Sequence, residues 1–150
     1  MKKYVIRPIA IIIAMIILSQ IIIQVLNNGI AYSIRFELLS IPCPDNAVIE
    51  GSMFIARKMF GNGNGMQYSG VLLIRSLENS KELTRYYRHY NPECEIELLQ
   101  SSVFVDAFSF KEISEIECYY VIYITHDIES GTIPDTFFYR ILSDCDIRGH

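Results

Sequence analysis

The chain has 150 residues, of which 51% are hydrophobic, and a formal net charge of −4 at pH 7. All 17 acidic residues lie from Glu37 onward with only 9 of the 13 Lys and Arg residues, so this part carries a net charge of −8. A chain without basic clusters is a poor partner for nucleic acid or anionic headgroups, whose binding depends on neutralising phosphate. We therefore expect a cationic or neutral partner and one modest domain after the N-terminal segment.

The N-terminal segment predicts a membrane-spanning helix. No charged residue occurs in Pro8–Ile34, and Ile9–Leu26 is almost wholly Ile, Leu, Val, Ala and Met. About 20 apolar residues cross a hydrocarbon core of about 30 Å, and a helix satisfies its own backbone hydrogen bonds there. Lys2, Lys3 and Arg7 precede this run, so the N-terminus is expected in the cytoplasm and the rest of the chain outside the cell membrane.

A cleaved signal peptide is the competing interpretation, since it also combines a basic start with an apolar run. The run here is longer than the 7–15 residues usual in a signal peptide. The sequence that follows, Gln24–Gly29, lacks a small-x-small cleavage pattern, and Pro42 directly before Cys43 makes a poor lipoprotein site. An uncleaved anchor is therefore favoured.

The chain is predicted to divide into three parts. The cytoplasmic tip and anchor cover residues 1–35. Pro42 and Pro44 limit any extension of the anchor helix to a stalk over residues 36–46. An extracytoplasmic domain then covers residues 47–150.

The domain is expected to begin with a β-hairpin. Val48–Phe60 and Tyr68–Leu77 are rich in strand-forming residues, and the Gly-Asn-Gly-Asn-Gly loop between them contains two Asn-Gly steps typical of a chain reversal. The loop lacks the Lys-Ser/Thr pair of a phosphate-binding loop and precedes a strand, which favours a hairpin tip over a nucleotide site. Exposed tips often carry binding function. Our candidates for partner contact here are Asn62, Asn64, Gln67 and Tyr68.

A single amphipathic helix is predicted after the hairpin. Asn79 can cap it, and Glu82 three residues later can complete a capping box. An apolar and aromatic face follows at helical spacing, made of Leu83, Tyr86, Tyr87 and Tyr90. Pro92 ends the helix.

Further strands are predicted beyond this helix. Apolar residues alternate with glutamates from Glu93 to Leu98, as in a half-solvated antiparallel strand. Three more strand candidates are Val103–Phe110, Cys118–Thr125 and Phe137–Leu142. The predicted fold is α+β: one transmembrane helix, then a two-layer sandwich of about six antiparallel strands covered by one helix.

The cysteines all follow the apolar segment. An even count in a small exported domain predicts up to two disulfides, for which three pairings remain open. The absence of a Cys-x-x-Cys pattern argues against a zinc knuckle or a redox pair. Alternatively, Cys94 and Cys118 are simply small buried residues. The four candidates are Cys43, Cys94, Cys118 and Cys145.

One group of residues offers a candidate for metal chemistry. A His-Asp step follows a predicted strand, and two aspartates and a histidine lie near the C-terminus. Oxygen and imidazole ligands converging at one sheet edge could support a metal-assisted hydrolase. Solvated acidic residues near a chain end are the competing interpretation, no motif identifies a nucleophile, and no cofactor is predicted. The candidate ligands are His126, Asp127, Asp144, Asp146 and His150.

Four sequence features together resemble a set of small membrane-anchored or exported bacterial proteins that have no established activity. These features are Gly61–Tyr68, the Glu82–Tyr87 helix, the run Tyr119–Tyr123 and the closing Asp146–His150. The resemblance implies a fold and a location but no catalytic role. It also directs attention to the closing segment, in which Arg148 is a further candidate for partner contact.

Three functions are compatible with this sequence. The favoured one is a non-catalytic, membrane-anchored binding module for another protein or envelope component, such as the product of a neighbouring locus. The second is the metal-assisted hydrolase. The third is a small accessory subunit of a membrane or secretion complex, in which Ser19, Gln20 and Gln24 of the anchor would form interhelical hydrogen bonds.

Overall fold

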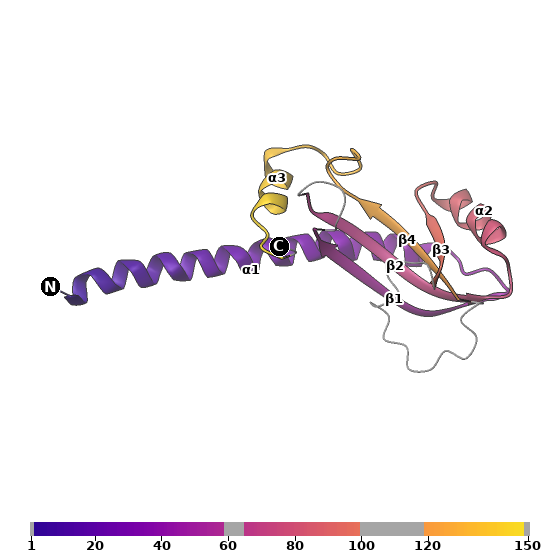
Figure 1. Cartoon of the computed structure of the whole chain (residues 1–150), viewed down its shortest axis with the longest axis horizontal. Coiled ribbons are helices and arrows are strands. Elements are labelled where there is room, and N and C mark those ends of the chain that lie inside the picture. Colours follow the sequence, from indigo (N-terminus) through magenta and orange to yellow (C-terminus); the bar gives the residue numbers. More distant parts are fainter. Residues whose placement is uncertain (1, 59–64, 100–118, 149–150) are drawn as a thin grey trace.

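A computed structural model of the protein describes residues 2–58, 65–99 and 119–148, with side chains from residue 8 onward. A long N-terminal helix leads into a domain of strands and short helices, and the first half of this helix extends away from the domain (Figure 1). The elements in chain order are α1 (Lys2–Ser40), β1 (Ala47–Arg57), β2 (Gln67–Ser76), α2 (Ser80–Tyr90), β3 (Glu95–Leu98), β4 (Tyr119–His126) and α3 (Phe137–Asp144).

The described strands form one four-stranded antiparallel sheet in the order β1-β2-β4-β3. The predicted hairpin is confirmed, since β1 pairs with β2 from Ala47 opposite Ser76 to Arg57 opposite Gln67. The α+β class and two of the later strands, β3 and β4, are also confirmed. The candidate strand Val103–Phe110 lies outside the described residues.

The prediction of a strand over Phe137–Leu142 is wrong, because this segment forms α3. Its run of aromatic and branched residues suits a strand, but Thr136 caps a helix by accepting a hydrogen bond from the Tyr139 N–H at 3.4 Å. Leu142 and Ser143 are buried together while both phenylalanines remain exposed. One-sided burial of consecutive residues fits a helix packed along one face, whereas a strand would alternate.

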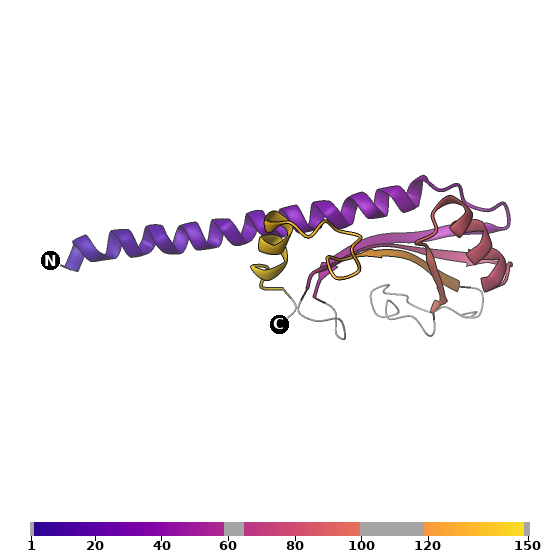
Figure 2. The ribbon, with the colours of Figure 1, turned by 90° about the horizontal axis from the view of Figure 1, so that it is seen from above.

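The predicted stalk is not separate from the domain. The second half of α1 lies along one face of the sheet (Figure 2). Ala31, Ile34 and Leu38 recur at helical spacing and are buried in the same core as Leu72 and Ile74 of β2. The second half of α1 is therefore the main cover of this face of the sheet. The sequence had predicted only one covering helix, the amphipathic helix after the hairpin.

The contact between α1 and β2 is backbone to backbone at Gly70. A Cβ atom at this position would lie 2.5 Å from the Arg35 backbone nitrogen and 2.7 Å from the Ile34 carbonyl carbon. Arg35 also fixes the helix to β1, because its Nε and one terminal nitrogen donate to Ser52 Oγ at 2.9 and 2.7 Å. The absence of a side chain at Gly70 thus sets how closely the helix approaches the sheet.

The predicted helix α2 covers the same face near the end of α1. Its cap is confirmed, since Asn79 Oδ1 accepts from the Lys81 and Glu82 N–H groups at 3.0 and 3.1 Å. Leu83 and Tyr87 are buried in the shared core. The opposite face of the sheet carries a smaller apolar cluster that includes Val71, Leu73, Leu99 and Val121.

The predicted disulfides are not found among the residues that the structure describes. Cys43, Cys94 and Cys145 are free thiols, and Cys118 lies outside the described residues. Cys145 follows α3, at the other end of the domain from α2 (Figure 1). Cys94 is fully buried, and this burial raises the pKa of its thiol to about 11, as suits a small buried core residue.

Candidate functional site

The first half of α1 is an apolar surface with no protein against most of it. Its large apolar side chains, from Ile9 to Leu26, are exposed on every side of the helix, with Ile23 as an exception at 9% exposed. Among the described residues, α1 is the helix that is long and apolar enough to cross a membrane, by length and composition. A signal sequence near the N-terminus would have the same features.

A buried polar cluster lies where this apolar half meets the domain. Asn27 is fully buried, and its Oδ1 accepts from the Tyr68 hydroxyl at 2.9 Å. Its Nδ2 donates to the Leu142 carbonyl at 3.0 Å and to Asp146 Oδ2 at 2.7 Å. One amide side chain therefore joins α1, β2, α3 and the C-terminal turn, and every heavy atom of its amide group that can form hydrogen bonds is used.

Asp146 and Arg148 complete this cluster. Asp146 is 1% exposed and accepts from Arg148 Nε and a terminal nitrogen, at 3.0 and 2.7 Å, while Arg148 also donates to Asn28 Oδ1 at 2.7 Å. Burial acts to raise the pKa of the Asp146 carboxyl, but the Arg148 and Asn27 hydrogen bonds outweigh it and the pKa is lowered. Burial and the Asp146 charge raise the pKa of Tyr68 to about 12. The cluster is built to hold a charged pair, not to release protons near neutral pH.

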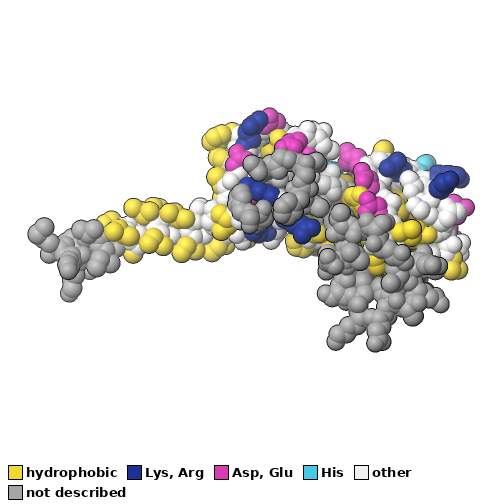
Figure 3. All heavy atoms as spheres, viewed as in Figure 1, with side chains coloured by type: hydrophobic (Ala, Val, Ile, Leu, Met, Phe, Trp, Pro, Cys, Tyr) yellow, Lys and Arg dark blue, Asp and Glu magenta, His cyan; other side chains and the backbone are white. Residues whose placement is uncertain are grey.

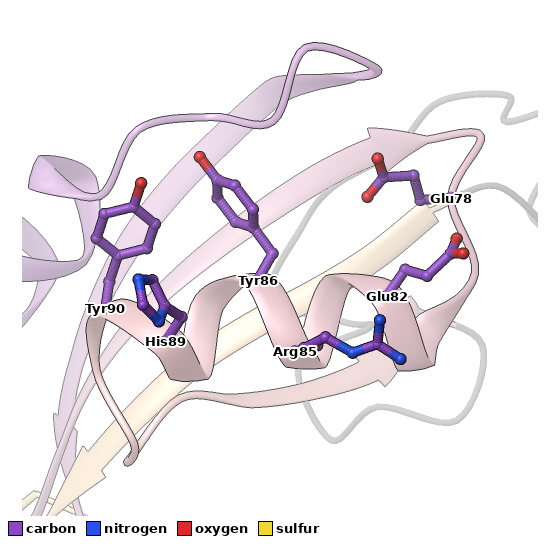
Figure 4. A pocket seen from close by; sticks show the side chains of 6 residues that line it. All are labelled: Glu78, Glu82, Arg85, Tyr86, His89 and Tyr90. Atoms are coloured by element: carbon purple, nitrogen blue, oxygen red, sulfur yellow. The ribbon is translucent and has the colours of Figure 1, made fainter.

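An open groove runs along the outer side of α2 (Figure 4). Its volume is about 510 Å³. Tyr86 and Tyr90 extend from the helix in the same direction, with ring centroids 5.4 Å apart, and the His89 ring lies 5.5 Å from that of Tyr90. The lining residues are Glu78, Glu82, Arg85, Tyr86, His89 and Tyr90. Two carboxylates thus lie at one end of an aromatic surface.

The groove is at the far end of the molecule from the apolar half of α1. Both ribbon views place α2 beyond the C-terminal end of α1, opposite the N-terminus (Figures 1 and 2). Its base is fixed, because Leu83 and Tyr87 on the inner side of α2 are fully buried. Tyr90 is 50% exposed, and exposed tyrosines offer a large contact area at low entropic cost.

Two of the predicted loop contacts are not at the surface. Gln67 is 8% exposed and Tyr68 is fully buried. Tyr68 points toward α1 from the start of β2, whereas Gln67, as the adjacent strand residue, points to the opposite face of the sheet. Gln67 Nε2 donates to Asp127 Oδ2 at 3.4 Å, and the Tyr68 hydroxyl donates to Asn27 Oδ1. Their burial argues against direct contact with a partner. Asn62 and Asn64 lie outside the described residues.

Where they are described, the candidate metal ligands other than Asp144 have structural partners. His126 Nε2 is 2.8 Å from Glu93 Oε2, and Asp127 Oδ1 accepts from the Ser130 N–H within a tight turn. Asp144 is exposed at the end of α3, whereas Asp146 is committed to Arg148. Within residues 2–58, 65–99 and 119–148, no three His, Cys, Asp or Glu side chains are grouped to hold a metal ion. His150 lies outside these ranges.

Two polar residues of the apolar segment, Ser19 and Gln20, form hydrogen bonds within the protein. Ser19 Oγ donates to the Ile16 carbonyl at 2.7 Å in the same helix, and Gln20 Nε2 donates to the Cys145 carbonyl at 3.0 Å. Arg148, a candidate for partner contact, links Asp146 and Asn28 within the protein. Asn27 was not among the residues predicted from the sequence, although an amide at the end of an apolar run is a signal for a buried polar contact.

Comparison of the chain with models of protein families, with curated proteins and with solved structures found no match.

Proposed function

We propose that this protein is a single-pass membrane protein that presents a non-catalytic binding domain outside the cell membrane. The first half of α1 is the anchor, with its N-terminus in the cytoplasm, and the groove on α2 is the binding surface. The observation that carries the proposal is the division of one continuous helix into a half exposed on nearly every side and a half with one side buried in the domain core.

The exposed apolar surface of the first half of α1 supports its assignment as a membrane anchor. Large aliphatic side chains that face solvent around a whole helix are unfavourable in water, at about 25 cal/mol per Å² of apolar surface. Lipid acyl chains remove this cost, and the helix satisfies its own backbone hydrogen bonds. The basic residues Lys2, Lys3 and Arg7 before the run, with Arg35 the next positive charge, support the orientation.

The lining of the α2 groove is suited to a protein partner with basic side chains and with aromatic or aliphatic ones. Glu78 and Glu82 would attract the basic groups, and the rings of Tyr86 and Tyr90 would contact the apolar ones. The net charge of −8 after residue 36 favours the same class of partner. Of the residues considered for hydrolysis, His126, Asp127 and Asp146 are bound to structural partners, which supports a non-catalytic role.

Anchoring and orientation are tested together by thiol labelling of intact cells. Lys81→Cys, on α2, is compared with Lys3→Cys at the N-terminus, each with the four native cysteines replaced by alanine. A membrane-impermeant maleimide is expected to label position 81 in intact cells and position 3 only after lysis. Labelling in the opposite order would reverse the topology, and loss of the protein into the soluble fraction after alkaline carbonate extraction would reject the anchor.

Binding at the groove is tested by photo-crosslinking in the native membrane. A photoreactive phenylalanine analogue replaces Tyr90, and the matched control replaces Phe54, an aromatic residue of β1 that is 38% exposed. We expect a defined crosslinked product from position 90 alone. Glu82→Lys should reduce it several-fold, whereas Glu129→Lys, the same charge change away from the groove, should not. Equal products from positions 90 and 54, or no effect of Glu82→Lys, would reject the groove.

A further inference from the structure

The C-terminal helix α3 is fixed beside the apolar half of α1. Gln20 Nε2 donates to the Cys145 carbonyl at 3.0 Å, directly after α3, and Asn27 Nδ2 donates to the Leu142 carbonyl at 3.0 Å. The two contacts are seven residues apart on α1. The last turn of α3 is thus held alongside the Gln20–Asn27 stretch, which is the end of the apolar run.

The length of the apolar run places this contact at the depth of the lipid. From Arg7, the last charged residue before the run, to Asn27 the helix rises about 30 Å, and to Gln20 about 20 Å. A bilayer hydrocarbon core is about 30 Å thick. With Arg7 at the cytoplasmic boundary, Gln20 and the Cys145 carbonyl lie about 10 Å inside the outer boundary. Any tilt of the helix would place them deeper.

The exposed side of α3 is apolar in agreement with that depth. Phe137 is 80% exposed, Phe138 53% and Ile141 38%, and Ile147 in the following turn is 62% exposed. Hydrophobic side chains cover the side of this region that faces the projecting half of α1 (Figure 3). Such a patch would be unfavourable in water but suits the boundary between headgroups and acyl chains.

The charged residues of α3 border this patch, because Asp144 is seven residues from Phe137 and lies close to the same line along the helix. Arg140 and Asp144 are four residues apart and so share one line along the helix, flanking the apolar side. Arg140 is paired with Asp135, with a distance of 2.7 Å between a terminal nitrogen and Oδ2. A short helix with a buried, an apolar and a charged side can therefore lie in the membrane surface while its ion pair stays at headgroup level.

We propose that α3 and Ile147 insert into the outer leaflet at the boundary between headgroups and acyl chains. This inference rests on the proposed membrane anchor. The domain then has two attachments to the bilayer, the span of α1 and the apolar side of α3, joined by the Asn27 cluster. Together they fix the tilt of the domain and hold the α2 groove away from the membrane.

Single tryptophan reporters test the inference, because the chain contains no tryptophan. The full-length protein is reconstituted into phosphatidylcholine vesicles with or without bromine atoms on the acyl chains, which quench tryptophan on contact. Phe138→Trp reports on α3, Ile13→Trp on the anchor, and Tyr90→Trp on the membrane-distal groove. All three positions are at least half exposed in the protein, so none of these changes requires repacking of the core.

We expect brominated lipid to quench Phe138→Trp to an extent comparable with Ile13→Trp, with a blue-shifted emission, and to leave Tyr90→Trp unquenched. Quenching at position 13 with an unquenched, red-shifted position 138 would overturn the insertion of α3 and leave the anchor intact. An unquenched position 13 would reject the anchor and this inference with it. As a second variant, Phe137→Glu in the Phe138→Trp chain should reduce the quenching at position 138 several-fold, whereas Glu129→Gln should not. Equal quenching in both variants would also overturn the inference.

Discussion

Adding one methyl group at Gly70 should separate α1 from the sheet. In Gly70→Ala the new Cβ would lie 2.5 Å from the Arg35 backbone nitrogen, where ordinary contacts begin at 3.4 Å. The helix must therefore move away by about 1 Å, because backbone atoms cannot rotate aside as side chains do. A gap of 0.5–1 Å forfeits a quarter to a half of each dispersion contact.

The cost can be estimated from overpacking in other cores, which is typically about 1–3 kcal/mol. The lost contacts extend along the whole interface that buries Ile34 and Leu38, so we expect a value near the upper end, about 3 kcal/mol. Replacing glycine also lowers the entropy of the unfolded chain, which stabilises the folded protein by about 0.4–1 kcal/mol and offsets part of this cost. A net destabilisation of about 2 kcal/mol is expected.

Gly29→Ala is the matched control, since a Cβ at Gly29 meets nothing within 4 Å. This change should stabilise α1 by about 1 kcal/mol, through helix propensity alone. Both variants are measured as full-length protein in the same detergent, by urea unfolding followed with far-UV circular dichroism. An unchanged midpoint for Gly70→Ala, or equal shifts for both variants, would refute the packing of α1 on β2.

Three further predictions concern the Asn27 cluster and the groove. Tyr68→Phe leaves the buried Asn27 oxygen without its donor and should lower the free energy of unfolding by about 1–3 kcal/mol; a loss below 0.5 kcal/mol in urea unfolding would contradict the burial of this contact. The pKa of Asp146 is lowered from 3.8, so its stabilising effect is present above pH 3.8 and is lost as pH falls through the folded pKa. Asp146→Asn should therefore weaken the pH dependence of unfolding below pH 3.8, and an unchanged dependence would exclude this carboxyl as its source. Tyr90→Ala should abolish partner crosslinking from a photoreactive group at position 86 without a change in the unfolding midpoint; retained crosslinking would exclude that ring.

Turn and capping residues predicted the elements whose boundaries depend on residues adjacent in the sequence. The Asn-Gly steps between two apolar runs identified the β1–β2 hairpin, and Asn79 identified the start of α2. The prediction for α3 failed because its aromatic and branched residues have strand propensity, while its helix depends on the Thr136 cap and on packing against α1. Propensity is a weak guide where tertiary contacts decide.

The long-range features could not be predicted from neighbouring residues. Asn27 and Asp146 are 119 positions apart, and their contact depends on the path of the whole sheet between them. The apolar residues that follow Asn27 were assigned to the span and a stalk, because hydropathy alone does not distinguish a lipid-facing residue from a core-facing one. Only the position of β2 shows that Ile34 and Leu38 belong to the core.

In the proposed arrangement, one unbroken helix serves as membrane anchor and as part of the domain core. Spin labels placed one at a time at positions 9–40 of the reconstituted full-length protein test it by their accessibility to oxygen and to a water-soluble nickel complex. We expect high oxygen and low nickel accessibility from Ile9 to Ser19. A regular helical period should continue without interruption past Asn27, with both reagents excluded at Ala31, Ile34 and Leu38. Nickel access throughout positions 9–19, or loss of the helical period between positions 27 and 30, would contradict this arrangement.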